Sequence, residues 1–179
     1  MRWYWIDRFL EFESGRRARA VKNVSLSEDH LHDHFPGRPV MPASLIIEGC
    51  AQAGGILVGE HLAFQGNMIL AKVPKAVFYF EAVPGDTLTY DLTLEHLNQE
   101  GALVAAACRV GGRLLAEVEL FFANVLEGER ARRLFTPREL LGMMRLLGVY
   151  DVGRAADGAK LCPPSLPPDE RIECASDDV

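Results

Sequence analysis

The sequence "PASLIIEGCAQAGGILVGEHL" (residues 42–62) is apolar nearly all round when it is written as a helix. A helix of this kind is normally buried inside a protein rather than lying on its surface. We therefore expect one long central helix over this stretch. Glu48 does not fit the pattern, because an ionised carboxylate is costly to bury unless it is paired, protonated or functional.

The sequence that follows this helix has the pattern of β-strands. Gly- and Pro-containing turn signals such as "VPGD" separate four strand-length runs, and one run upstream of the helix also alternates. A helix followed by an antiparallel meander is typical of the α+β class, and we expect a curved antiparallel sheet wrapped around one long central helix. The runs are 17–26, 68–80, 86–98, 102–110 and 113–125.

Composition limits the class of protein. The 179 residues suit one domain, and the formal net charge of -6 argues against a nucleic-acid binder. Residues 1–12 carry two acidic residues where a signal peptide needs an apolar run, and no later run approaches the length of a membrane span. The four cysteines have no CxxC spacing, which favours thiols over disulfides or zinc. We expect a cytoplasmic protein without a membrane span.

The chain divides into a main domain, residues 1–126, and a C-terminal extension, residues 127–179. The extension contains "TPRELLGMMRLLG", in which Thr136 and Glu139 form a capping box at the start of an amphipathic helix over about residues 136–148. The Pro-rich, acidic end is predicted to be a poorly ordered tail. One face of the helix is expected to carry Leu140, Met144 and Leu147.

Three groups near the start of the central helix could act together. His34 precedes a Phe-Pro-Gly turn that can bring its imidazole over the helix start, where it would be a general base beside Glu48 as general acid. Gln52 lies on the same helix face as Glu48, within hydrogen-bonding reach. Residues 42–44 begin the helix, whose free backbone N–H groups can bind a developing oxyanion. This combination indicates enolate chemistry; the alternative is that Glu48 pairs with a strand Lys or Arg.

A metal site is the other interpretation of this region. His30, His32 and His34 alternate, and on a strand their rings would share a face as metal ligands do. However, prolines follow closely, the preceding residues resemble a helical turn, and no downstream carboxylate or cysteine has ligand spacing. We expect neither a metal nor another cofactor.

Two stretches carry a resemblance to a known family. "NVSLSEDHLHDHFPGRPVMPASLIIEGCAQAGGIL" (23–57) and "PKAVFYFEAVPGDTLTYDLTL" (74–94) resemble the β-hydroxyacyl-acyl-carrier-protein dehydratases of type II fatty acid synthesis, which have the hot-dog fold. The resemblance covers roughly residues 1–125. It implies a lyase that removes water from a (3R)-3-hydroxyacyl thioester to give the trans-2-enoyl thioester, for fatty acid or related lipid biosynthesis.

The resemblance also implies roles for single residues. His34 would take the C2 proton, and Glu48 would help the 3-hydroxyl group to leave as water. Gln52 would hold the Glu48 carboxyl group in place. Gly37 and Ala43 would position the thioester and its developing oxyanion.

The chain departs from the family pattern at two positions. Ala43 stands where the family usually has glycine, but alanine keeps the backbone N–H that polarises the thioester carbonyl. Asp33 replaces a common glycine, and a neighbouring anion would make His34 more basic. The acid is Glu48 rather than the Asp of the related bifunctional dehydratase/isomerase class, which favours plain dehydration.

In this family the His and Glu of one site come from different subunits, so the resemblance implies an obligate homodimer, or a trimer of such dimers. A single sheet around one helix also leaves an edge strand and the helix start uncovered, which a two-fold partner would protect. The acyl chain would lie in a tunnel along the interface. Its candidate lining residues are Ile46, Phe78 and Phe80.

The expected partner is an acyl carrier protein that carries the substrate. Such a partner is acidic, so docking needs local positive charge on this acidic chain. Two other functions remain open: a non-catalytic hot-dog subunit that binds acyl thioesters, and a hot-dog thioesterase. The candidate docking residues are Arg38, Lys72, Lys75, Arg130, Arg132, Arg133 and Arg138.

Overall fold

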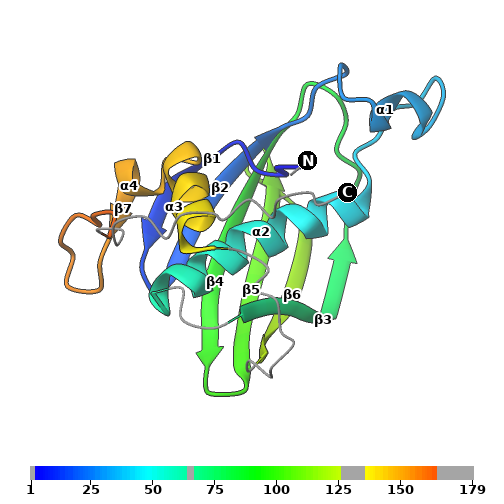
Figure 1. The fold of residues 1–179 in the computed structure, drawn as a ribbon. Coiled ribbons are helices and arrows are strands. Elements are labelled where there is room, and N and C mark those ends of the chain that lie inside the picture. Colours follow the sequence, from blue (N-terminus) through cyan, green and yellow to red (C-terminus); the bar gives the residue numbers. More distant parts are fainter. Residues whose placement is uncertain (1–2, 64–66, 126–135, 165–179) are drawn as a thin grey trace, which may run out of the picture.

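The computed structural model describes residues 3–63, 67–125 and 136–164. A seven-stranded sheet, in the order β3-β6-β5-β4-β2-β1-β7, curves around helix α2 (Ala43–His61), as Figure 1 shows. The predicted α+β fold, a curved sheet wrapped around one long helix, is thereby confirmed. The strands are β1 (Arg8–Glu13), β2 (Arg17–Asn23), β3 (Asn67–Phe78), β4 (Thr87–Leu97), β5 (Gly101–Val110), β6 (Arg113–Val125) and β7 (Gly153–Arg154).

The pairing of the strands differs from the prediction at one edge of the sheet. Strands β1 to β6 pair antiparallel, as expected for hairpins and meanders. β7 comes from the C-terminal extension and pairs parallel with β1, so the sheet is mixed. Neither β1 nor β7 was predicted, because both are short and neither alternates clearly between apolar and polar residues.

Only one side of α2 is buried. Its sheet-facing side packs into the core with side chains from the central strands, whereas Ala43, Ser44 and Glu48 are exposed. The expectation that this helix is buried on all sides is therefore wrong for the single chain, because one curved sheet covers only one side of a helix. The largest fully buried side chains include Ile46 and Leu57 of α2 and Tyr90, Leu92, Leu115 and Leu120 of the sheet.

Two of the cysteines meet in this core. The Sγ atoms of Cys50 and Cys108 lie 3.3 Å apart, and both residues are free thiols. Their hydrogen bond, together with burial, raises the pKa of the Cys50 thiol well above its ordinary value. Cys162 is also a free thiol, so the prediction of thiols is confirmed for these three; Cys174 lies outside the described residues.

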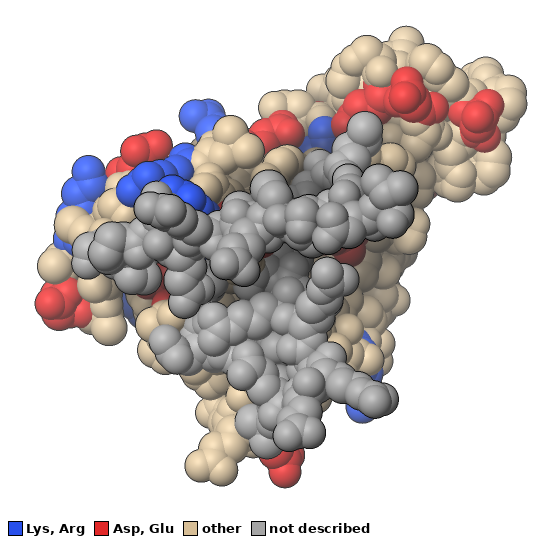
Figure 2. All heavy atoms as spheres, in the orientation of Figure 1, with Lys and Arg blue, Asp and Glu red and all other residues tan. Residues whose placement is uncertain are grey.

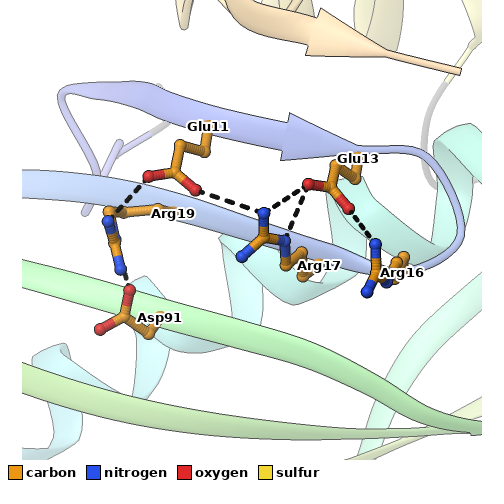
Figure 3. Close-up of polar contacts among 6 residues, drawn as sticks. All are labelled: Glu11, Glu13, Arg16, Arg17, Arg19 and Asp91. Carbon is orange, nitrogen blue, oxygen red and sulfur yellow. Dashed lines mark hydrogen bonds and ion pairs between the residues drawn. The ribbon is translucent and has the colours of Figure 1, made fainter. Parts of the chain in front are cut away.

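Ion pairs link the strands on the outer surface of the sheet (Figure 3). Arg19 of β2 lies directly opposite both Glu11 of β1 and Asp91 of β4 in the strand register. Its guanidinium donates to Glu11 at 2.7 Å and to Asp91 at 2.5 Å. Arg109 of β5 approaches the second oxygen of Asp91 at 3.4 Å. Such cross-strand pairs favour the observed register.

Residues 136–164 of the C-terminal extension pack on the β1 edge of the sheet (Figure 1). Helix α3 (Pro137–Leu146) begins with the capping box of Thr136 and Glu139, and α4 (Val149–Val152) leads into β7. The N–H of Phe9 donates to the carbonyl of Leu147 at 2.8 Å. Leu140 is only half-buried, in contrast to the predicted face, and Leu141 takes its place in the core. The buried side chains of this unit are Leu141, Met144, Leu147, Val149 and Tyr150.

Candidate active site

His34 stands at the start of a tight turn. It follows α1 (His30–Asp33), a single helical turn, and the His34–Phe35 peptide bond is cis. Phe35 and Arg38 exchange two backbone hydrogen bonds of 3.0 and 2.9 Å across Pro36 and Gly37. Gly37 has a φ of 74°, which a residue with a side chain rarely adopts. The Pro-Gly sequence therefore matches the conformation of the turn that presents His34.

The turn is attached to the chain before β4. Arg38 forms an ion pair with Glu81, and the N–H of Met41 donates to the carbonyl of Ala82 at 2.8 Å. The half-buried His34 ring stacks on Phe35 with 4.2 Å between ring centroids. Arg38, one of the predicted docking residues, is thus paired with a carboxylate of its own chain.

The start of α2 offers unpaired backbone donors. Pro42 is the N-cap, and the first helical hydrogen bonds are those of Leu45 and Ile46 to its carbonyl. Within the described part of the chain, no acceptor pairs with the N–H groups of Ala43 and Ser44. Both residues are exposed, so these donors and the positive end of the helix dipole can reach an anionic ligand.

Glu48 lies on the uncovered side of α2. The Nε2 of Gln52 donates to its Oε1 at 3.0 Å, as the spacing of the two residues predicted. In residues 3–63, 67–125 and 136–164, Glu48 makes no ion pair with a strand Lys or Arg, nor a hydrogen bond with His34 of the same chain. The structure therefore gives Glu48 an amide partner and leaves its second oxygen available.

The three alternating histidines do not share a face. His30 packs edge-on against Trp5 at 5.2 Å, the Nε2 of His32 is 3.2 Å from the carbonyl of Leu26, and His34 stacks on Phe35. They lie on and just after a helical turn, where alternate residues point in different directions. Nowhere in the described residues do three histidine, cysteine or acidic side chains gather as metal ligands.

A partly buried ion pair, which the sequence did not predict, supports the chain before α1. Lys22 of β2 is 6% exposed and donates to Glu28 at 2.6 Å. Burial disfavours the charged form of Glu28, but hydrogen bonds from Lys22 and from the Ser25 N–H outweigh it and lower the pKa of Glu28. A lysine in an alternating strand normally indicates a solvent-exposed position, so the sequence carried no signal for this contact.

The predicted tunnel residues differ in their burial. Ile46 is 2% exposed and belongs to the core of the single chain. Phe78 and Phe80 are half-buried and pack against that core, and the guanidinium of Arg113 lies 4.1 Å from the ring centroid of Phe80. Phe78 and Phe80 therefore remain accessible to a ligand, whereas Ile46 does not.

A curved sheet wrapped around one central helix defines the hot-dog class. Solved structures share this fold: the protein smu.793 of Streptococcus mutans bound to acetyl CoA has a TM-score of 0.56 and 17% identity, covering 70% of this chain and 93% of that one. The dehydratase heterocomplex ApeI:P of Xenorhabdus doucetiae has a TM-score of 0.56 and 15% identity. The match covers 78% of this chain and 88% of that one.

Sequence comparison places the chain more narrowly. Residues 3–119 match the FabA-like domain family, and the chain belongs to this family. The 3-hydroxyacyl-[acyl-carrier-protein] dehydratase FabZ of Pelotomaculum thermopropionicum is 43% identical over 119 residues, which are 66% of this chain and 85% of the relative. The FabZ of Desulforamulus reducens is 41% identical over 119 residues, which are 66% of this chain and 84% of that relative. The predicted family is thereby confirmed.

Of the helices that the structure describes, none is long and apolar enough to cross a membrane.

Proposed function

We propose that this protein dehydrates (3R)-3-hydroxyacyl thioesters, carried by an acyl carrier protein, to trans-2-enoyl thioesters. Membership of the FabA-like family and similarity to several FabZ dehydratases support this activity. The observation that carries the proposal is the pair of chemical groups at the start of α2: His34 on its turn and Glu48 with one oxygen held by Gln52.

Each group has one role in the proposed reaction. The His34 imidazole removes the C2 proton, and the N–H groups of Gly37 and Ala43 stabilise the charge that develops on the thioester oxygen. The C2 electrons form the C2–C3 double bond as the C3–O bond breaks. Glu48, protonated at the start, gives its proton to the leaving hydroxyl, which departs as water. Transfer of the proton from His34 back to Glu48 restores the resting state.

We further propose that the site is shared between two copies of this chain. β3 lies at an edge of the sheet and carries exposed apolar side chains, and an open edge of this kind favours pairing with another strand. A second copy paired there would also cover the exposed side of α2 that carries Glu48. The exposed apolar residues of this edge are Leu70, Val73, Val77 and Tyr79.

An acyl carrier protein as partner requires a local basic surface. Figure 2 shows Lys and Arg gathered at the end formed by β1, α3 and α4, whereas Asp and Glu gather over α1. Of the docking residues that the sequence suggested, Lys75 pairs with Glu117 at 3.4 Å, and Lys72 is exposed on β3. Arg130, Arg132 and Arg133 lie outside the described residues. We propose Lys72, which lies on the edge strand β3 itself, as a docking contact.

The test is to incubate the protein with 3-hydroxyacyl thioesters on acyl carrier protein and on N-acetylcysteamine. We expect enoyl absorbance without release of free thiol. His34→Ala and Glu48→Gln should each lower kcat by about 100-fold or more, because each removes a proton-transfer group. His32→Asn, at an exposed position on the same helical turn, is the control and should keep full activity.

Other outcomes separate the alternatives. Thiol release would indicate a thioesterase, and binding without either product would indicate a non-catalytic subunit. Full activity in Glu48→Gln would contradict the proposed acid.

A further inference from the structure

The amide of Gln52 is held in one orientation by the amino-terminal segment (residues 3–5). The N–H of Trp5 donates to its Oε1 at 2.9 Å, and its Nε2 donates to the carbonyl of Trp3 at 2.9 Å and to Glu48 at 3.0 Å. A backbone N–H can only donate and a carbonyl can only accept. Turning the amide over would therefore break the contacts on both sides, so Nε2 must face Glu48.

This segment lies directly on α2. Trp5 is 8% exposed. A Cβ atom at position 49 would lie 2.8 Å from the Trp5 carbonyl oxygen and 2.7 Å from the Tyr90 hydroxyl, closer than real contacts allow. Gly49, next to Glu48, thus permits the close approach of the segment to the helix. The two backbone groups that hold Gln52 are therefore placed by packing, and not only by their hydrogen bonds.

Trp5 also packs near His34, the second catalytic candidate of its own chain. Its indole packs edge-on against His30 at 5.2 Å between ring centroids, and His30 lies one helical turn before His34. One residue therefore touches both the helix that carries Glu48 and α1, the helical turn that directly precedes His34. Figure 1 shows the amino-terminal chain running beside α2 on the way to β1.

We propose that the amino-terminal segment is a positioning element that selects which oxygen of Glu48 carries the acidic proton. This inference rests on the proposed function, in which Glu48 is the general acid. Because Gln52 donates to Oε1, a proton on Oε1 would point one donor, the acid O–H, at another, the Gln52 N–H. In the acid form that the reaction requires, the proton is therefore on Oε2. As the C3–O bond breaks, this proton moves to the leaving hydroxyl, water departs, and Glu48 is left ionised with Oε1 still accepting from Gln52.

The first experiment compares Trp5→Pro with Trp5→Ala. Both variants lose the indole, but only proline lacks the N–H that donates to Gln52. We expect kcat of Trp5→Pro to be about tenfold below that of Trp5→Ala, the effect of one lost hydrogen bond, with the same KM. Equal kcat values in two folded variants would overturn the proposal.

The second experiment tests the direction of the hydrogen bond. Gln52→Glu can still accept from Trp5 but cannot donate to Glu48, whereas Gln52→Met can do neither. We expect both variants to lose activity to a similar extent without a change in KM. Wild-type turnover in Gln52→Glu would show that the donor to Oε1 is not needed.

A spectroscopic measurement on the wild-type protein covers the case in which Trp5→Pro does not fold. The side-chain amide resonance of Gln52, assigned by its absence in Gln52→Met, should show two protons that exchange slowly with water. Fast exchange of both protons would overturn the inference. The Glu48→Gln assay tests the proposed function separately. If Glu48→Gln is inactive but Trp5→Pro and Trp5→Ala have the same kcat, the proposed function stands and only the positioning role of the amino-terminal segment fails.

Discussion

At the scale of single residues, Glu48 shows how sequence context and structural environment can differ. Its neighbours in the chain are apolar, which predicted a buried carboxylate in need of a partner. In the structure it lies on the exposed side of α2, where Gln52 binds one of its oxygens. The residue type and its spacing from Gln52 were readable from the sequence. Its exposure was not, because it depends on which side of the helix the sheet covers.

His30 supports a prediction about pH. Burial lowers the pKa of His30, Lys22 and His34 lower it further, and Glu28 and Asp29 oppose the shift. The folded protein thus binds the proton less readily than the unfolded chain, so stability should fall as pH drops from above 6.5 through the folded pKa. When the pH is lowered from about 7.5 to about 5.5, the thermal midpoint of His30→Phe should therefore decrease by less than that of the wild-type protein.

The control for this prediction is His32→Phe, at an exposed position of the same helical turn. It should show the wild-type dependence. The pH range of this experiment ends before Glu28 becomes protonated. The pKa of Glu28 is lowered, so its ion pair with Lys22 weakens only in stronger acid. Identical pH profiles for His30→Phe and wild type would contradict the assignment.

At the scale of elements, the C-terminal extension is an addition to the hot-dog sheet. The capping box was readable from the sequence, and α3 begins there. Met144 and Leu147 of the predicted face are buried, Leu141 is buried in place of Leu140, and β7 was not predicted. A two-residue strand has no periodicity to detect. It forms because β1 presents an open edge beside α4.

Met144 tests whether this extension contributes to stability. It is 0% exposed, whereas Leu146, two residues later on the same helix, is 66% exposed. Met144→Ala should lower the free energy of unfolding by about 2–5 kcal/mol, as is usual for a large core side chain. Leu146→Ala should change it by less than about 0.5 kcal/mol. Chemical denaturation measures both, and equal values would mean that α3 does not pack as described.

At the scale of the whole molecule, the sheet has two different edges. β7 and the helices of the extension occupy the β1 edge, and β3 forms the other edge with exposed apolar side chains. The proposed dimer uses the β3 edge. It would complete the site by bringing His34 of one copy to Glu48 of the other, two groups that make no contact within one chain of the described structure.

Mixing two inactive variants tests this arrangement. In a random mixture of His34→Ala and Glu48→Gln chains, half of the dimers are hybrids, and each hybrid has one site with both groups intact. We therefore expect about a quarter of the wild-type activity after subunit exchange. Each variant alone should remain inactive. No recovery, despite proven exchange, would mean that each site is built within one chain.

The sequence by itself determined the α+β class, the family and the chemical groups, since helical periodicity, strand alternation and the His-Phe-Pro-Gly turn are local patterns. Tertiary structure decided what depends on distant residues: the exposure of Glu48, the burial of Lys22 beside Glu28, and the contact of residues 3–5 with Gln52. These contacts form only when the sheet closes around α2 and brings together segments far apart in the chain. The turn that carries His34 is a local structure, whereas the orientation of Glu48 depends on the packing of the amino-terminal segment against α2.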